Sequence, residues 1–217
     1  MKYIRYSLTS GISLISFLAA LHAAPAQAGP AEDYAEGTKQ RYAVGDLIAA
    51  MPLLRRAADA GHAAAQAAMG EILDHADSDP EAIEYFRKSA TQGNADGQFG
   101  LATMLAVGEG APKDLAGARK WIVLAAEQGH KIAINELAQA YIIGGLDIPD
   151  DKRQSAEALR WIRAAADNGY LTAMDKLAAA YRTGDLGLGI DIKAADQWVE
   201  KIRKIRGAPK KRRAKKE

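Results

Sequence analysis

Residues 118–129 read ARKWIVLAAEQG, and this stretch decides the fold because its pattern returns along the chain. Its ending, two small residues, two variable ones and a glycine, occurs again at residues 57–61, 89–93 and 165–169. The four glycines therefore lie 32, 36 and 40 residues apart. A sequence that resembles itself at such a period is typical of a repeat protein.

Fixed positions around each glycine carry the apolar residues. An alanine stands eleven residues before each glycine: Ala50, Ala82, Ala118 and Ala158. A bulky residue stands eight before it: Leu53, Tyr85, Trp121 and Trp161. A leucine or methionine stands eight after it: Met69, Leu101, Leu137 and Leu177. These offsets predict an amphipathic helix on each side of the glycine, which can adopt the left-handed conformation that ends a helix. One such pair cannot bury its apolar face alone, so we expect an all-α stack of antiparallel helix pairs.

Both ends of the array are visible in the sequence. Tyr34 and Tyr42 fit the second-half pattern of a preceding unit, which predicts a leading helix within residues 29–45. Ala195 and Trp198 begin the pattern once more, but Arg206 stands where the glycine is expected. We therefore expect about four units plus a C-terminal capping helix over residues 46–206.

Composition and charge narrow the function classes. The 217 residues include 46 alanines and no cysteine, which suits closely packed helices and leaves no disulfide, thiolate chemistry or cysteine-bound metal. Residues 29–200 hold 17 basic and 26 acidic side chains, whereas residues 201–217 hold ten basic and one acidic. An acidic body thus precedes a basic end.

The first 28 residues predict a secretory signal peptide. Lys2 and Arg5 precede an apolar run of about 14 residues, and a small-x-small site ends at Ala28. That run is shorter than the roughly 20 residues of a membrane span. We expect cleavage after Ala28 and a periplasmic or secreted protein with no transmembrane segment after processing, and an uncleaved anchor is the alternative.

The repeat resembles the Sel1-like family, which is related to the tetratricopeptide solenoids. The third unit carries the motif throughout: Leu101, Ala102, Leu105, Gly108, Gly110, Asp114, Ala118, Trp121, Ala125, Ala126 and Gly129. The resemblance covers residues 45–206 and implies a right-handed α-solenoid. Departures lie in the link at residues 77–80, the long loop at residues 146–154 and Gly97, where alanine is usual.

The sequence offers little catalytic chemistry. His75 lies near Asp74, Asp77 and Asp79, but an Asp-x-Asp-Pro linker is typical of a turn and helix cap rather than a metal site. His62 and His130 occupy the same position at the start of a helix, and Trp121, Trp161 and Trp198 fall on core positions. A platform that stacks a sugar or base is the alternative for the tryptophans. We expect no enzyme, no metal and no cofactor.

By resemblance, we expect an exported scaffold or regulator that binds another protein in the cell envelope. The alternative is a hydrolase or binding protein for β-lactam or cell-wall substrates, as in the cysteine-rich branch of the family. Members of that branch tie each helix pair with a disulfide, and this chain has no cysteine.

The resemblance also implies a binding face, because the first helix of each pair lines the concave side of related solenoids. Positions 3, 6, 10 and 13 residues after each glycine should face outward there: Asp33, Glu36, Glu71, Asp74, Asp96, Phe99, Ile132, Asn135, Gln139, Ile142, Asp175 and Arg182. We expect a groove that is acidic toward its N-terminal half and apolar around Phe99, Ile132 and Ile142. Such a groove suits a basic or amphipathic segment, and the alternative is a solvated surface without a ligand.

Residues 207–217 form a basic tail without apolar periodicity, which predicts disorder in isolation. Its cations are Lys210, Lys211, Arg212, Arg213, Lys215 and Lys216. Because the signal peptide takes the chain away from nucleic acid, we expect anionic lipid, acidic polysaccharide, an acidic protein or the chain's own groove as its partner. A tail that only aids solubility is the alternative.

Overall fold

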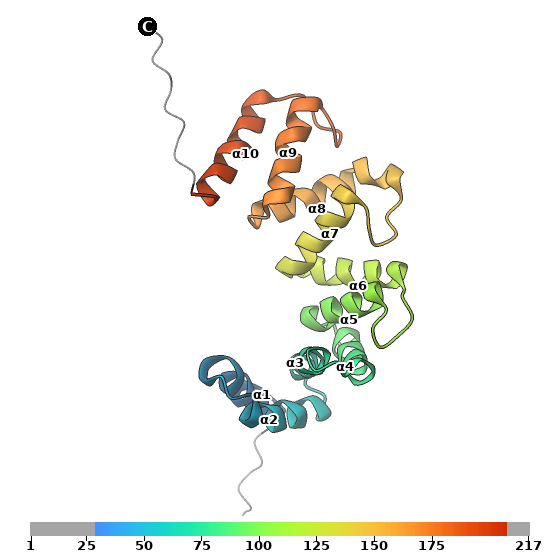
Figure 1. Ribbon diagram of the computed structural model, residues 1–217, viewed down its shortest axis with the longest axis vertical. Helices are drawn as coiled ribbons and strands as arrows, with labels where there is room; N and C mark the ends of the chain where they lie inside the picture. The colour runs from blue at the N-terminus through green and yellow to red at the C-terminus, as the bar shows by residue number, and fades with distance from the viewer. Residues whose placement is uncertain (1–28, 208–217) are drawn as a thin grey trace, which may run out of the picture.

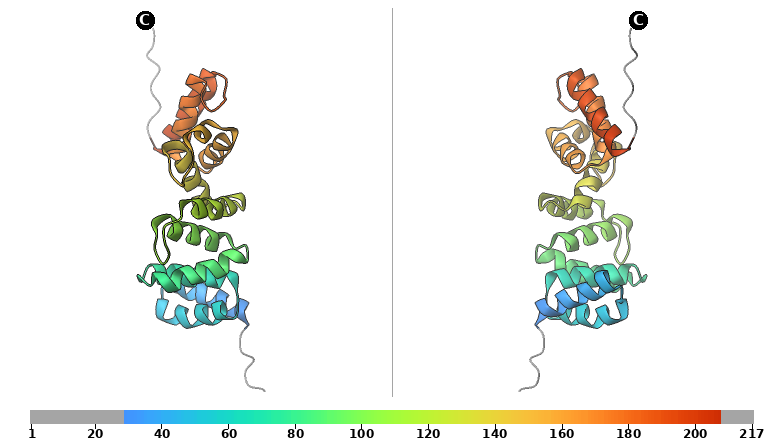
Figure 2. Two further views of the ribbon diagram at one scale, coloured as in Figure 1. Left: turned by 90° about the vertical axis from the view of Figure 1, so that its right-hand side faces the viewer. Right: turned by 90° about the vertical axis from the view of Figure 1, so that its left-hand side faces the viewer.

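The computed structural model describes residues 29–207, so the predicted signal peptide and residues 208–217 lie outside the described residues. Ten α-helices stack there in antiparallel pairs into an elongated, curved array (Figure 1), and Figure 2 shows the layers from both sides. The predicted all-α solenoid is confirmed. None of the helices between residues 29 and 207 has the length and apolar character that a bilayer crossing requires.

Each pair consists of a first and a second helix. The first helices are α1 (Pro30–Lys39), α3 (Ala63–Asp74), α5 (Ala95–Val107), α7 (Lys131–Ile143) and α9 (Leu171–Thr183). The second helices are α2 (Leu47–Asp59), α4 (Asp79–Thr91), α6 (Leu115–Glu127), α8 (Ala156–Asp167) and α10 (Ile192–Ile205). The predicted leading helix is α1, followed by a π-helical turn η1 (Gln40–Val44), and a 3-10 helix η2 (Asp150–Gln154) precedes α8.

Every turn from a second helix into the next first helix has the same geometry. Gly61, Gly93, Gly129 and Gly169 have φ of 89°, 85°, 83° and 89°. In each turn the glycine N–H donates to the carbonyl three residues back and the next N–H to the carbonyl five back, as at Gly129 (2.9 Å) and His130 (3.1 Å). No neighbour lies within 4 Å of a Cβ built on any of these four glycines. Glycine is therefore needed for its left-handed backbone and not for space.

The end of α10 corrects the expectation that Arg206 replaces this glycine. The helix is one residue longer than predicted, and Gly207 adopts the left-handed conformation with φ of 66°. Its N–H donates to the Lys204 carbonyl at 3.2 Å, as the equivalent glycines do. The last described residue thus forms the turn that elsewhere leads into a first helix.

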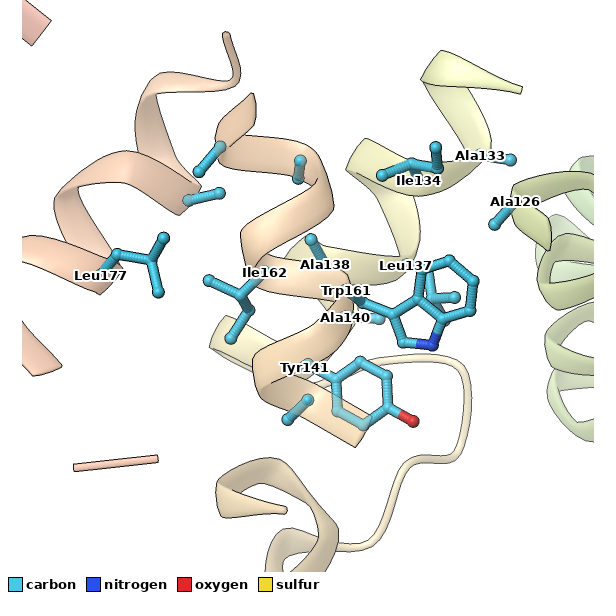
Figure 3. Close-up of a cluster of buried hydrophobic side chains, with 14 of the residues drawn as sticks. Ala126, Ala133, Ile134, Leu137, Ala138, Ala140, Tyr141, Trp161, Ile162 and Leu177 are labelled. Atoms are coloured by element: carbon cyan, nitrogen blue, oxygen red, sulfur yellow. The ribbon is translucent and has the colours of Figure 1, made fainter. Parts of the chain in front are cut away.

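The core consists of two apolar clusters. The C-terminal cluster contains Trp161, which is 3% exposed and lies among Leu137, Tyr141 and Ile162 (Figure 3). The N-terminal cluster extends from Ala50 to Met104. Trp121 is only half-buried, but it packs against both clusters.

Trp121 joins the N-terminal and C-terminal halves of the stack, whose neighbouring first helices, α5 and α7, are separated. Helix α3 packs on α5 and α7 packs on α9, whereas α5 and α7 hardly touch. Helix α6 contributes Ile122, Ala125 and Ala126 to the C-terminal cluster and packs on both α5 and α7, so α6 carries most of the junction between the halves. Trp198 is half-buried too, and packs against the C-terminal cluster.

The links that join the first helix of a pair to its second helix vary in length. They span residues 75–78, 108–114, 144–155 and 184–191, and the last two of them touch. The Gln154 side chain accepts a hydrogen bond from the Leu186 backbone N–H at 3.0 Å, and Arg119 donates to the Asp147 carbonyl. These links contact one another at the edge of the stack away from the glycine turns.

Candidate functional site: the first-helix groove

A hollow lies along the first helices. It has a volume of about 430 Å³, and its lining residues come from α1, η1, α3, α5 and the start of α7, with Leu54 and Phe86 reaching in from second helices. We call it the first-helix groove. Five of the predicted binding residues line it: Glu71, Asp74, Asp96, Phe99 and Ile132.

The other predicted residues lie elsewhere. Gln139 lines a second hollow of about 420 Å³ between α5 and α7, which shares Phe99 with the first. Ile142 lines a smaller hollow with Arg153 and Lys176. The remaining predicted residues on these helices, namely Asn135, Asp175 and Arg182, line neither the groove nor these hollows.

Asp33 is a correction, because the prediction that it faces outward is wrong. Only 4% of it is exposed, and it accepts a hydrogen bond from Arg56 Nε at 2.7 Å. The hydrogen bond from the Arg56 guanidinium lowers the pKa of the Asp33 carboxyl. Helix α1 packs on α2, whose Arg56 binds this carboxylate, so Asp33 faces α2 rather than the outer side of the stack.

The Glu36 carboxylate is also bound by neighbouring side chains of the same chain segment. Its carboxylate accepts hydrogen bonds from Gln40 at 2.7 Å and Lys39 at 3.2 Å. These two partners, Gln40 first, lower the pKa of the Glu36 carboxyl. The two carboxylates predicted to make α1 acidic, Asp33 and Glu36, are thus bound by side chains close to them. The acidic part of the groove therefore begins at α3.

The π-helical turn supplies one wall of the groove. Arg41 pairs with Glu71 at 3.0 Å, and the Tyr42 hydroxyl donates to the same carboxylate at 3.4 Å. Partial burial, followed by the neighbouring Glu71 charge, raises the pKa of the Tyr42 phenol, so it stays protonated as a donor. Asp74 has no ion pair among the described residues, which leaves its carboxylate available.

The opposite wall carries a stacked imidazole. The His130 ring lies on Phe99 with centroids 4.7 Å apart, and its Nε2 is 3.3 Å from Asp96 Oδ1. Its Nδ1 accepts the Ala133 N–H at 3.1 Å, which leaves the ring proton on Nε2, the nitrogen that faces Asp96. His62 stacks on Tyr34 in the same way, with centroids 4.6 Å apart. The prediction that both histidines start a first helix is confirmed.

Sequence reasoning missed these stacks. The two aromatic partners stand at different offsets from their histidines, 28 and 31 residues earlier, so no repeated spacing signals them. The chemical consequence is a groove with an aromatic floor between carboxylates. A cationic side chain finds both a counter-ion and an aromatic face there.

A buried ladder of glutamines supports the groove from below. Gln66 Nε2 donates to the Ala58 carbonyl at 3.0 Å, and Gln92 donates to Gln66 Oε1 at 2.7 Å. The next repeat copies the ladder with Gln98 and Gln128, which are joined at 2.7 Å. Glutamine recurs five residues after and one residue before the glycine, and that signal was available in the sequence.

The residues considered for other chemistry have structural roles. The His75 imidazole bonds to the Glu71 backbone carbonyl at 2.7 Å and so caps its own helix. Between residues 29 and 207, no three histidine, aspartate or glutamate side chains converge as metal ligands. Gly110 has φ of 68°, and a Cβ there would lie 2.5 Å from the Asp79 carbonyl oxygen. The Gly108–Gly110 loop therefore packs on the preceding repeat.

Solved structures with a similar fold are repeat proteins of the same kind. A Sel1 repeat protein from Oxalobacter formigenes matches with a TM-score of 0.65 and 26% identity, over 81% of this chain and 73% of that one. The protein c5321, a protective antigen present in uropathogenic Escherichia coli strains and displaying an SLR fold, matches with a TM-score of 0.69 and 26% identity. That match covers 81% of this chain and 38% of c5321. A search of curated proteins found no match.

The Sel1 repeat model matches five segments, residues 34–62, 63–94, 95–130, 132–170 and 171–201. It counts each repeat from a first helix to the following second helix, so α1 and α10 belong to full repeats rather than to caps. The matched segments cover most of the chain in register with the helix pairs of the fold. The chain therefore belongs to the Sel1 repeat family.

Proposed function

We propose that this chain is an exported scaffold of the cell envelope that binds a basic segment of a partner protein in the first-helix groove. Sel1 repeat proteins are typically protein-interaction scaffolds. The observation that carries the proposal is the placement of Asp74 and Asp96 beside an apolar floor of Phe99 and Ile132.

The size and chemistry of the groove set the kind of ligand. A hollow of about 430 Å³ accepts a few side chains of an extended or helical segment, not a whole domain. Asp74 and Asp96 have no lysine or arginine partner among the described residues, whereas Glu71 is held by Arg41. We expect lysine or arginine of the partner at the two aspartates and an apolar anchor over Phe99.

Export is proposed from the leader alone. Lys2, Arg5, the apolar run and the small residues at 26–28 support cleavage, and a chain without cysteine needs no disulfide formation outside the cytoplasm. N-terminal sequencing of protein from a periplasmic extract should begin at Gly29. Protein that keeps residues 1–28 or stays in the cytoplasm would contradict export.

No observation between residues 29 and 207 favours the alternative of a hydrolase for β-lactam or cell-wall substrates. The imidazoles of His62 and His130 accept helix N–H groups and stack on aromatic rings. The imidazole of His75 bonds to its own helix.

Site-specific photocrosslinking tests the proposed groove. A photoreactive residue at Thr103, exposed in the groove, should capture a partner in living cells, and the same residue at Lys120 on α6 should not. Asp74→Lys combined with Asp96→Lys should abolish the capture from Thr103. Asp167→Lys, on an exposed aspartate at the end of α8, is the matched control and should preserve it. Equal capture from both positions, or no capture from Thr103, would contradict the proposal.

A further inference from the structure

We propose that the basic segment 208–217 of the same chain folds back into the first-helix groove and competes there with the partner. Only the competition rests on the proposed function; the intramolecular contact stands by itself. The segment holds six cations and one acidic residue, and residues 29–200 hold nine more acidic than basic side chains. Charge complementarity therefore favours the groove as its site.

The geometry of the last turn gives the segment its direction. After each of the other left-handed glycines that end a second helix, the chain enters a first helix and so lies on the face that contains the groove. Gly207 repeats this turn at the end of α10. Residue 208 therefore starts where a further first helix would start, on the groove side of the stack.

A contact beside this exit already joins the chain end to that face. Arg206 Nη2 lies 3.4 Å from Asp175 Oδ2 on α9. Asp175 is one of the positions predicted to face outward on the first helices. Arg206, next to the exit of the segment, is thus paired with Asp175 on a first helix, and Asp96 lies on another first helix of the stack.

The length of the segment determines which part of the groove it reaches. Ten extended residues span at most roughly 33 to 36 Å. Two steps between neighbouring first helices separate α9 from α5, and packed helices lie about 8 to 10 Å apart. Because α5 and α7 hardly touch, their step is wider, and an extended segment leaves roughly 13 to 20 Å beyond two packed steps for that extra width. We place the segment over Ile132, Phe99 and Asp96 rather than over the distant Glu71.

The receiving surface suits lysine and arginine. Asp96 is 70% exposed, and its ion-pair partner among the described residues is His130. The Phe99 ring lines the groove beside it, and the face of an aromatic ring attracts a cation. The contact is electrostatic and partly exposed, so salt should weaken it.

A spin label tests the contact, because a chain without cysteine accepts a single engineered thiol. In full-length Ala214→Cys carrying a nitroxide, the amide signals of α5 and of the start of α7 should broaden at low salt. Those of α4 should not, and 0.5 M salt should remove the effect. No selective broadening at low salt would overturn the proposal.

Two comparisons sharpen the test. Asp96→Lys should remove the broadening, and the control Asp167→Lys should keep it. In a mixture of unlabelled isotope-enriched chain with spin-labelled chain, broadening of the enriched chain would show a contact between copies and overturn the intramolecular assignment.

A binding assay measures the competition separately. A synthetic peptide of residues 208–217 should bind a full-length variant with its six tail cations changed to glutamine about tenfold more tightly than it binds the original chain. Equal affinity would overturn the competition. Capture of a partner from Thr103 without spin-label broadening would leave the proposed function intact while overturning this inference.

Discussion

His130 combines a helix cap, an aromatic stack and a carboxylate contact in one side chain. Loss of a capping side chain costs about 1 kcal/mol of folding stability. We therefore expect His130→Ala to lower the free energy of unfolding by about that amount. His130→Asn should restore most of it, because Asn94 caps α5 through the equivalent N–H at 2.9 Å. Urea unfolding at neutral pH measures both, and an asparagine variant no more stable than the alanine variant would contradict a capping role.

Asp33 gives the fold an acid-sensitive contact. Its folded-state pKa is lowered by the hydrogen bond from Arg56, so the pair stabilises the fold above about pH 4, the pKa of an ordinary aspartate. This contribution disappears as the pH falls through the lower folded-state value. Asp33→Asn should therefore destabilise the protein at pH 6.5 but hardly at pH 2.5. Urea midpoints at the two pH values test this, and an equal loss at both would show that charge is not the cause.

At the scale of the helix, the glutamine ladder fixes how neighbouring repeats align. Gln98 is 4% exposed, donates to the Ala90 carbonyl and accepts from Gln128, so Gln98→Ala removes two side-chain hydrogen bonds. Such a loss costs about 1 to 3 kcal/mol. Gln197→Ala, on an exposed glutamine of α10, is the control and should cost less. Chemical denaturation of both variants compares them, and equal losses would mean that the ladder adds nothing beyond packing.

Trp161 should bind neighbouring helix pairs together. Replacing a buried tryptophan by alanine typically costs about 3 to 5 kcal/mol. In a linear array the loss falls first on adjacent units, so hydrogen exchange in Trp161→Ala should accelerate within residues 118–206. Uniform acceleration from residue 31 onward would indicate one undivided core instead.

The elements were predictable to different degrees, for physical reasons. The glycine spacing predicted the helix pairs and the first-helix face, because backbone conformation and apolar periodicity are local properties. The inward position of Asp33 was not predictable, since it depends on the pairing with Arg56 of α2, which the spacing of apolar residues does not report. The stack of His130 on Phe99 depends on the crossing of two helices, and spacing does not report that angle. Glu71, Asp74, Asp96, Phe99 and Ile132 were placed in one groove correctly, but their role as a binding site stays a prediction.

At the scale of the whole molecule, the two core clusters should unfold separately once their junction is weakened. Trp121 packs against both clusters, while α5 and α7 hardly touch. Trp121→Ala should split the thermal unfolding of the full chain into two calorimetric transitions. Trp198→Ala, which changes a half-buried tryptophan at the far end, serves as the control and should not split it. A single transition in Trp121→Ala would show that the packing of α6 on α5 and α7 couples the halves without this side chain.

The links of unequal length share one edge of the stack, and this has a consequence for how such a protein can change. An insertion at residues 108–114 or 144–155 lengthens a loop at that edge without shifting the helices that carry the groove. The edge that carries the links is therefore free to change in sequence and length, whereas the first helices that line the groove must keep their geometry. A reporter domain inserted between the exposed Asp150 and Asp151 should leave the groove as it is, which makes this edge an attachment point for engineering.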